Sequence, residues 1–436
     1  MEELGASKII PTSKIQPTIH PSFPTEKVSF VDHSIEKITP CIIHPESVDL
    51  NELSTIEFII HECSGQYLDL SSLKLEVKLE LLDAAGIRDG ILAGTKVYFV
   101  NNLLHSLFPV VKVYINNENV ETNYHSNHLS RISHILDTPE NIISNRGEPQ
   151  GLFPIKPNQV AQTIVDGTAD ANGKRMTFSK KQPLHLKGFL NLDICSLNKW
   201  LVDGCTVRVV LETARNSYCI NATNNDVAFK KNIQSVRLHI DRIKPSSGGF
   251  LATTKYLQTQ NLEYIYRRNV IHSEILAQGQ RSLTITRPFN NRIPSKFHIF
   301  MIDQTADSGT YNKDPYYYNS NKISNYRVML NGEVISDTDC NSDEGYVNVY
   351  HDSMIAHGAN DSYIPYELYA KGSFVITVSC NSSQSGQLSY ENKGNLSIYL
   401  RFEEVIPQNQ IVFIVGSVHS TFEVTADRNI ISNFGY

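Results

Sequence analysis

SLKLEVKLEL, residues 72–81, alternates apolar and charged side chains without a break. Four leucines and one valine occupy every second position, and Lys or Glu separates them. In an extended chain the apolar residues therefore face one way and the charged residues face the other. This period of two predicts a half-buried antiparallel strand, with one face on a core and the other in solvent.

Strand patterns of this kind recur along the chain. They are LHLKGFLNLD (184–193), TVRVVLET (206–213), SVRLHID (235–241), SLTITRP (282–288), FVITVS (374–379), LSIYLRFE (396–403) and IVFIVG (411–416). RVMLNGEVI (327–335) adds a hairpin, because Asn331-Gly332 supplies the positive φ of a tight two-residue turn. Helical patterns are few and short. The sequence predicts an all-β chain of sandwiches or barrels, joined by loops and short helices.

VNNLLHSLFPVVKVYINN, residues 100–117, places a histidine and two asparagines among large apolar residues. The apolar positions 100, 103, 104, 107 and 108 form one stripe of a short helix, and His105 falls on another face. After Pro109 the period changes to two, which predicts a strand. The stretch is therefore a helix that packs, ends at a proline and continues as a strand, and His105 needs no catalytic role.

The chain carries a weak internal repeat. VYINNE (113–118) and VMLNGE (328–333) share the order apolar, large, apolar, Asn, turn residue, Glu, and they lie about half the chain apart. Strand patterns fill both halves at similar density. Together these features favour a chain built from two similar β units.

Composition excludes several classes of protein. The 436 residues are 41% hydrophobic and 19% charged, enough to bury a large core. The net charge of −6, with basic residues at most in pairs, argues against specific nucleic-acid binding. The seven cysteines form no CxxC pair and predict free thiols. No run predicts a membrane span, and MEELGASKIIPTSK has no apolar core of a secretion signal.

The first 45 residues differ from the rest of the chain. Six prolines interrupt them and no period is sustained, which predicts an extended N-terminal arm over residues 1–45. Either the arm is ordered by contacts with a partner, or it is a disordered tail.

The sequence contains no complete motif for catalysis, phosphate binding or metal binding. There is no phosphate-binding glycine loop and no nucleophile elbow. His61-Glu62 starts like a zinc-protease helix, but glycine stands at the position of the second histidine. His125, His128 and His134 have helical spacing without a cysteine or carboxylate to complete a metal site, and we expect them to be solvated.

Two further segments resemble sites without completing them. DTDCNSDEG (337–345) matches the first ligands of a calcium loop but lacks its glycine and its final glutamate, which favours a solvated loop and leaves weak calcium binding as the minor alternative. No basic residues flank the Tyr316–Tyr318 triplet closely enough to form a track for nucleic-acid binding, which favours a loop anchor or a subunit contact. The sequence therefore predicts no catalytic residue, no metal site and no cofactor, and a protein that is not an enzyme.

Several stretches, taken in order, resemble one family. VNNLLHSLFPVVKVYINNENVETN (100–123), ITRPFNNRIPSKFHIFMIDQTADSGTYNKDPYYYN (285–319), YELYAKGSFVITVS (366–379) and TADRNIISNFGY (425–436) are similar to stretches of the major capsid proteins of Polinton/Maverick elements and adintoviruses, which also occur in animal genomes. The resemblance covers roughly residues 50–436. The chain departs from the family in its compact length and in a short loop around GQYLDLSSLKLEV.

The resemblance implies a double jelly roll, two eight-stranded sandwiches in tandem. We expect the first to span 46–220 and the second 221–436, divided in the turn-rich RNSYCINATNNDV (215–227). It also implies a hexon-like capsid protein whose homotrimers have a pseudo-hexagonal outline and tile an icosahedral shell. Expected partners are neighbouring capsomers, penton proteins and minor capsid proteins. The expected location is the virion, after synthesis in the host cytoplasm and assembly there or in the nucleus.

Two other interpretations remain. Jelly rolls also host lectins, so a tandem sugar-binding module is an alternative. A host-domesticated capsid relic that no longer assembles is a variant of the first interpretation. A sandwich hydrolase would need paired carboxylates in a cleft, and the adjacent Glu403 and Glu404 would face opposite sides of a strand.

Overall fold

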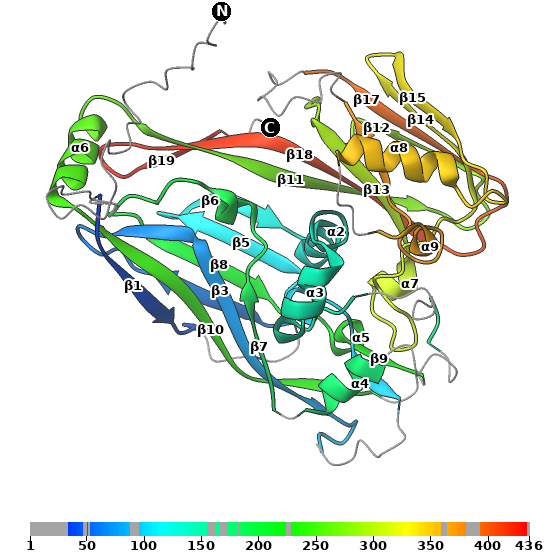
Figure 1. Ribbon diagram of the computed structural model, residues 1–436, viewed down its shortest axis with the longest axis horizontal. Coiled ribbons are helices and arrows are strands. Elements are labelled where there is room, and N and C mark those ends of the chain that lie inside the picture. Colours follow the sequence, from blue (N-terminus) through cyan, green and yellow to red (C-terminus); the bar gives the residue numbers. More distant parts are fainter. Residues whose placement is uncertain are drawn as a thin grey trace, which may run out of the picture.

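The computed structural model describes residues 34–433, apart from the internal gaps 47–49, 51–52, 88–95, 155–161, 165–172, 182, 224–227, 359–363 and 381–392. The chain forms two β-sandwich lobes that pack against each other (Figure 1). The first lobe fills the lower left of Figure 1, and the sheets of the second lobe extend from the upper right across the top. None of the described helices is both long enough and apolar enough to span a membrane.

The first lobe contains two four-stranded antiparallel sheets over one core. One sheet has the order β1 (Ile35–Ile43), β10 (Lys230–Pro245), β3 (Tyr67–Leu82), β7 (Leu184–Phe189), and the other has β2 (Thr55–Ile60), β8 (Val207–Glu212), β5 (Val110–Ile115), β6 (Glu118–Asn123). A short pair, β4 (Val97–Phe99) and β9 (Ile220–Ala222), lies beside them. β3 contains the alternating stretch 72–81, whose apolar side chains are at most 2% exposed. The predicted half-buried strand is confirmed.

The second lobe repeats this architecture. Its first sheet has the order β11 (Leu262–Leu276), β18 (Gln410–Val424), β13 (Lys296–Asp303), β16 (Ile376–Ser379), with β19 (Ile430–Asn433) also paired to β18. Its second sheet has the order β12 (Ser282–Thr286), β17 (Leu396–Phe402), β14 (Ile323–Leu330), β15 (Glu333–Asp339). Glu403 and Glu404 follow the end of β17, outside the strand on which we placed them.

The strand order is the same in both lobes. Counting the eight sandwich strands of each lobe along the chain, one sheet has the order first, eighth, third, sixth, and the other has second, seventh, fourth, fifth. The two copies of the weak repeat are equivalent hairpins, β5–β6 and β14–β15. Both turns have positive φ, at Asn116 and Asn117 in one and at Asn331 and Gly332 in the other. The predicted duplication is confirmed.

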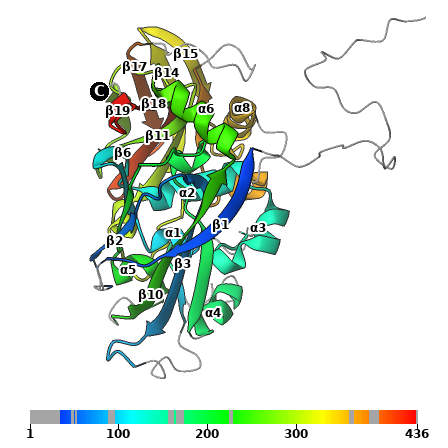
Figure 2. The same ribbon diagram turned by 90° about the vertical axis from the view of Figure 1, so that its left-hand side faces the viewer.

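Strand pairing differs from the predicted ranges at two places. β10, which the predicted division assigns to the second unit, pairs with β1 and β3 of the first lobe. β1, which we included in the arm, is an edge strand of the same sheet and is visible at the front of Figure 2. Turn residues around 215–227 mark a break between strands, but they do not determine which sheet the next strand joins. The rest of the arm, residues 1–33, lies outside the described residues.

Short helices connect the strands. They are α1 (Leu103–Ser106), α2 (Ser126–Asp137), α3 (Glu140–Arg146), α4 (Gly173–Lys180), α5 (Asn216–Cys219), α6 (Ser247–Leu257), α7 (Gln304–Asp307), α8 (Val347–His357), α9 (Tyr366–Tyr369) and the 3-10 turns η2 (Glu148–Gln150) and η6 (Asp193–Ser196). α1 followed by β5 confirms the predicted helix, proline and strand. α1 is only one turn long, and both its polar and its apolar residues are buried.

Each lobe completes the core of the other. Four residues of α2, which belongs to the first lobe by sequence, join the core of the second lobe: Leu129, Ile132, Ile135 and Leu136. In return, Tyr264 and Tyr266 of β11 and Phe422 of β18 join the core of the first lobe, where Phe422 stacks on Tyr264 with ring centroids 4.8 Å apart. The lobes therefore share buried apolar surface and do not merely touch.

Candidate functional site at the lobe junction

Helix α2 lies at the junction of the two lobes, in the centre of Figure 1. Its first residue is held by a backbone bond from Ser126 N–H to Pro109 O of 2.9 Å. It ends at Asp137, and the next residue, Thr138, is extended, as expected of a residue before proline. Both faces of the helix are in contact with protein, so its polar residues are buried together with its apolar residues.

The histidines of α2 correct one prediction. We expected His125, His128 and His134 to be solvated, but His128 is 0% exposed and the other two are largely covered. The ring of His128 lies against Phe413 and Phe300 of the second lobe, and its Nε2 is 3.0 Å from Asp307 Oδ1 of α7. Helical spacing identifies which residues share a face, but a face covered by a segment 170 or more residues away has no local signal.

Burial changes the protonation of the junction histidines. Burial lowers the pKa of His105 and of His125 to about 4, and His128 also lowers that of His125. The pKa of His134 falls to about 3, through burial first and then the nearby His105. These imidazoles are therefore neutral at pH 7. His105 accordingly has the structural role that the sequence favoured, and its Nδ1 lies 3.2 Å from Asn102 Oδ1.

The tyrosine triplet anchors one lobe to the other. Tyr316 and Tyr318 are at most 4% exposed, and Tyr316 OH lies 2.6 Å from Ser106 Oγ of α1. Ser106 Oγ in turn donates to Asn102 O at 2.7 Å. The interpretation as a loop anchor is therefore confirmed for Tyr316, whose partner is the other half of the same chain. Tyr318 packs within its own lobe, with its ring 4.7 Å from that of Phe300.

Tyr316→Phe is expected to lower the free energy of unfolding by about 1–2 kcal/mol. The change removes the only hydroxyl that donates to the buried Ser106 Oγ among the described residues, and leaves that oxygen without its donor. Urea unfolding followed by circular dichroism measures the change. Tyr317→Phe is the matched control, because Tyr317 is half-buried. Loss of its hydroxyl is expected to lower the free energy of unfolding by less than about 0.5 kcal/mol. Equal losses in the two variants would contradict the anchor.

A buried pair of carboxyl groups lies on the first-lobe side of the junction. Glu121 accepts backbone N–H groups from Asp193 and Ile194, both at 2.9 Å, at the start of η6. Asp193 accepts the backbone N–H of Asn269 at 2.7 Å and its Nδ2 at 2.6 Å, which connects η6 to β11. Burial raises the pKa of both carboxyl groups, and each carboxyl has neighbouring donors that partly oppose the rise.

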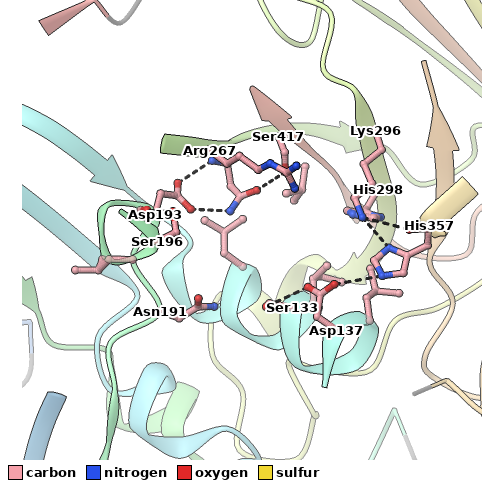
Figure 3. A pocket seen from close by; sticks show the side chains of 16 residues that line it. Ser133, Asp137, Asn191, Asp193, Ser196, Arg267, Lys296, His298, His357 and Ser417 are labelled. Carbon is pink, nitrogen blue, oxygen red and sulfur yellow. Dashed lines mark hydrogen bonds and ion pairs between the residues drawn. The ribbon is translucent and has the colours of Figure 1, made fainter. Parts of the chain in front are cut away.

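A cavity of about 240 Å³ opens between α2, η6 and the β11–β18–β13 face (Figure 3). Leu129, Ile132 and Leu136 of α2 and Val415 of β18 supply its apolar wall. Its ionisable side chains are Arg267 of β11, Lys296 and His298 of β13, His357 at the end of α8, Asp137 at the end of α2 and Asp193 of η6. In Figure 3 the basic side chains lie above and to the right of the helix, and Asp137 lies below them.

The basic cluster beside this cavity is tightly connected. Lys296 Nζ lies 3.3 Å from His357 Nδ1, and His357 Nε2 lies 3.2 Å from Asp137 Oδ1. His298 Nδ1 is 2.9 Å from Thr377 Oγ1, and its ring is 5.7 Å from that of His357. Burial, together with the nearby His357 and Lys296, lowers the pKa of His298 to about 3. The arrangement is suited to holding a negatively charged group.

Sequence reasoning missed this cluster. Its members come from strands and a helix spread over residues 137–357, so no local spacing connects them. One signal was available: in KFHIFMID, the strand β13, seven of eight residues are buried, and a lysine and a histidine on such a strand need a specific partner.

The remaining candidates from the sequence are the acidic segment 337–345, His61 and the cysteines. Asp337 is at the end of β15 and pairs with Arg327 at 2.8 Å, and Ser342 bonds to Glu403, so the segment 337–345 is an exposed strand end and turn. His61 follows β2 and is not on a helix. The residues that the structure describes contain no cluster of three or more His, Cys, Asp or Glu placed to hold a metal ion. All seven cysteines are free, as predicted.

Comparison with solved structures identifies the architecture. The chain is similar to a chain in the structure of the Sputnik virophage, with a TM-score of 0.62, 13% identity and coverage of 97% of this chain and 93% of that chain. It is similar to the Faustovirus major capsid protein, with a TM-score of 0.63, 9% identity and coverage of 94% and 93%. It is also similar to the mavirus major capsid protein, with a TM-score of 0.52, 13% identity and coverage of 99% and 96%. The fold is a double jelly roll.

That result confirms the predicted fold class. The similarity extends over nearly the whole of this chain and of each of those chains, so both lobes and their relative arrangement are included. No protein-family model and no curated protein sequence matches the chain.

Proposed function

We propose that this protein is a major capsid protein. The observation that carries the proposal is the identical strand order of the two lobes, combined with whole-length similarity to proteins described as major capsid proteins of Faustovirus and mavirus. At 9–13% identity this similarity is one of fold, and the capsid role is our inference from it.

The geometry gives this role a physical basis. Three chains with two similar lobes each would present six similar lobes around one axis. Such a trimer has closed three-fold symmetry, so each unit is of limited size, and its outline is pseudo-hexagonal. Units with this outline can pack side by side to form a closed shell. We propose that the first unit ends with β10 and that the second begins with β11, with α6 as the connection.

We propose that the trimer contacts neighbouring capsomers, penton proteins and minor capsid proteins in the virion, and that the N-terminal arm contributes to these contacts. A more specific origin among the Polinton/Maverick and adintovirus capsid proteins is supported by four stretches that keep the family's order along the chain: 100–123, 285–319, 366–379 and 425–436. The first of them contains α1 and the β5–β6 hairpin, and the second contains β13, α7 and Tyr316, which contacts α1 across the lobe junction.

Purified full-length protein is expected to be a trimer. Light scattering after size-exclusion chromatography should give three times 49.1 kDa, about 147 kDa, because a tile with a closed outline requires three copies. Negative-stain images should show a six-lobed particle. A monodisperse monomer of about 49 kDa at the highest accessible concentration would contradict the proposal.

A further inference from the structure

The cavity at the lobe junction contains cations that lack carboxylate partners. Arg267 forms no ion pair with any described residue, and the polar contacts of Lys296 are the Nδ1 atom and the carbonyl oxygen of His357, at 3.3 and 3.4 Å. The two carboxylates of the cavity are already engaged. Asp137 accepts from Ser133 Oγ and pairs with His357, and Asp193 accepts from Asn269.

The crowded basic groups oppose one another's charge. Burial lowers the pKa of Lys296, and Arg267 lowers it further, which places the two cations within electrostatic range of each other. Nearby Asp137 acts in the opposite direction without removing the effect. A half-buried ammonium group without its own anion is costly, and an anion bound between it and Arg267 would offset that cost.

We propose that the cavity at the lobe junction binds a small oxyanion of the phosphate class, held by Lys296 and Arg267. The volume of about 240 Å³ accommodates such an anion with a few waters, since one water occupies about 30 Å³ of liquid. Asn191 Nδ2 lines the same cavity and can donate to a remaining oxygen, whereas Ser417 Oγ already donates to Asn269 Oδ1 at 2.7 Å. The inference rests on one chain and does not depend on the capsid assignment.

The bound anion would connect the two lobes. Arg267, Lys296 and Ser417 belong to the sheet of the second lobe, whereas Asn191 lies between β7 and η6 of the first. Binding would therefore stabilise the junction, and its effect should appear in the stability of the whole chain.

Isothermal titration of the full-length protein with inorganic phosphate at pH 7 tests the inference. Sodium chloride at equal ionic strength serves as the reference. The expected dissociation constant is on the order of 1 mM or tighter, with a rise of about 1–2 °C in the thermal midpoint at about ten times that concentration. Phenyl phosphate titrated in parallel distinguishes a site for the free ion from one that also accepts a phosphomonoester, and binding of either supports the proposal.

Variants separate binding in the cavity from a general salt effect, since phosphate stabilises proteins by exclusion from their surface. Lys296→Met and Arg267→Gln are expected to weaken binding at least 10-fold. Arg267 is exposed, so its variant should fold normally. Arg401→Gln removes an exposed strand arginine of the same lobe, away from the cavity, and should bind like the unchanged protein.

An equal response of all four proteins to phosphate, or no response in any of them, would overturn the proposal. Light scattering on the same samples reports assembly separately. An unchanged protein that forms the trimer but binds no phosphate contradicts the site alone, whereas an unchanged protein that binds phosphate as a monomer contradicts the capsid role alone.

Discussion

Phe413→Ala is expected to lower the free energy of unfolding by about 3–5 kcal/mol. Phe413 is fully buried on β18, and its ring lies 5.3 Å from that of Phe300 in the same lobe. It also lies 5.0 Å from the ring of His125 and 5.2 Å from that of His128, both from the first lobe. Removing the ring leaves a cavity between β18 and α2. Both elements are held in place by their own lobes, so they cannot move together to fill it.

Urea unfolding at a fixed protein concentration measures this loss, because assembly would otherwise shift the apparent stability. Phe189→Ala is the matched control. Phe189 is 54% exposed at the end of β7, and Lys74 Nζ lies 4.9 Å from the centre of its ring, so removal of the ring should cost about 1 kcal/mol or less. A loss for Phe413→Ala no larger than that of the control would contradict the shared core.

The second large effect is expected on acidification. His105, His125, His134 and His298 have pKa values lowered to about 4, 4, 3 and 3. In the unfolded chain each would titrate near 6.5. Their contribution to stability is therefore fully present above about pH 6.5 and is lost as pH falls toward 4. Between pH 7 and pH 5 each neutral histidine should account for a loss of about 2 kcal/mol.

The buried carboxyl pair acts in the opposite direction. The pKa values of Glu121 and Asp193 are raised, so the pair destabilises the fold as pH rises, and acidification relieves that strain. The net curve is therefore shallower than the histidines alone would produce. Substituting one histidine at a time separates its contribution to the pH dependence of stability from the contribution of the carboxyl pair.

Urea unfolding at pH 7 and pH 5 compares each variant with the unchanged protein. His105→Gln and His298→Gln are each expected to reduce the loss of stability between these two pH values by about 1–2 kcal/mol. His351→Gln is the control, because the side chain of His351 is 72% exposed on α8 and remains in water in both states. A pH dependence that is unchanged in the two buried-site variants would argue against neutral histidines at the junction.

Much of the fold could be predicted because its signals are local. The alternation in 72–81 and the Asn331-Gly332 turn depend only on neighbouring residues, and both are found as expected in β3 and in the β14–β15 hairpin. The hairpin match between 113–118 and 328–333 was sufficient to indicate duplication, because equivalent turns need the same positive φ.

The rest depends on contacts between distant segments. SVRLHID lies in β10 and closes the sheet of the first lobe, a pairing that its own sequence does not encode. The histidines of α2 looked solvated because the lobe that covers them lies far along the chain. Lys296, His357 and Arg267 meet only because β13, α8 and β11 converge at the junction, so no local spacing connected them, and the lysine and histidine of the buried strand β13 were the one available signal.

The reciprocal exchange of core residues has an evolutionary consequence. An ancestral gene that doubled would at first have encoded two self-sufficient halves, each able to survive alone. Here α2 supplies hydrophobic mass to the C-terminal half, and β11 with β18 supplies it to the N-terminal half. The halves are consequently inherited as one unit, and a substitution in either selects for compensation in the other.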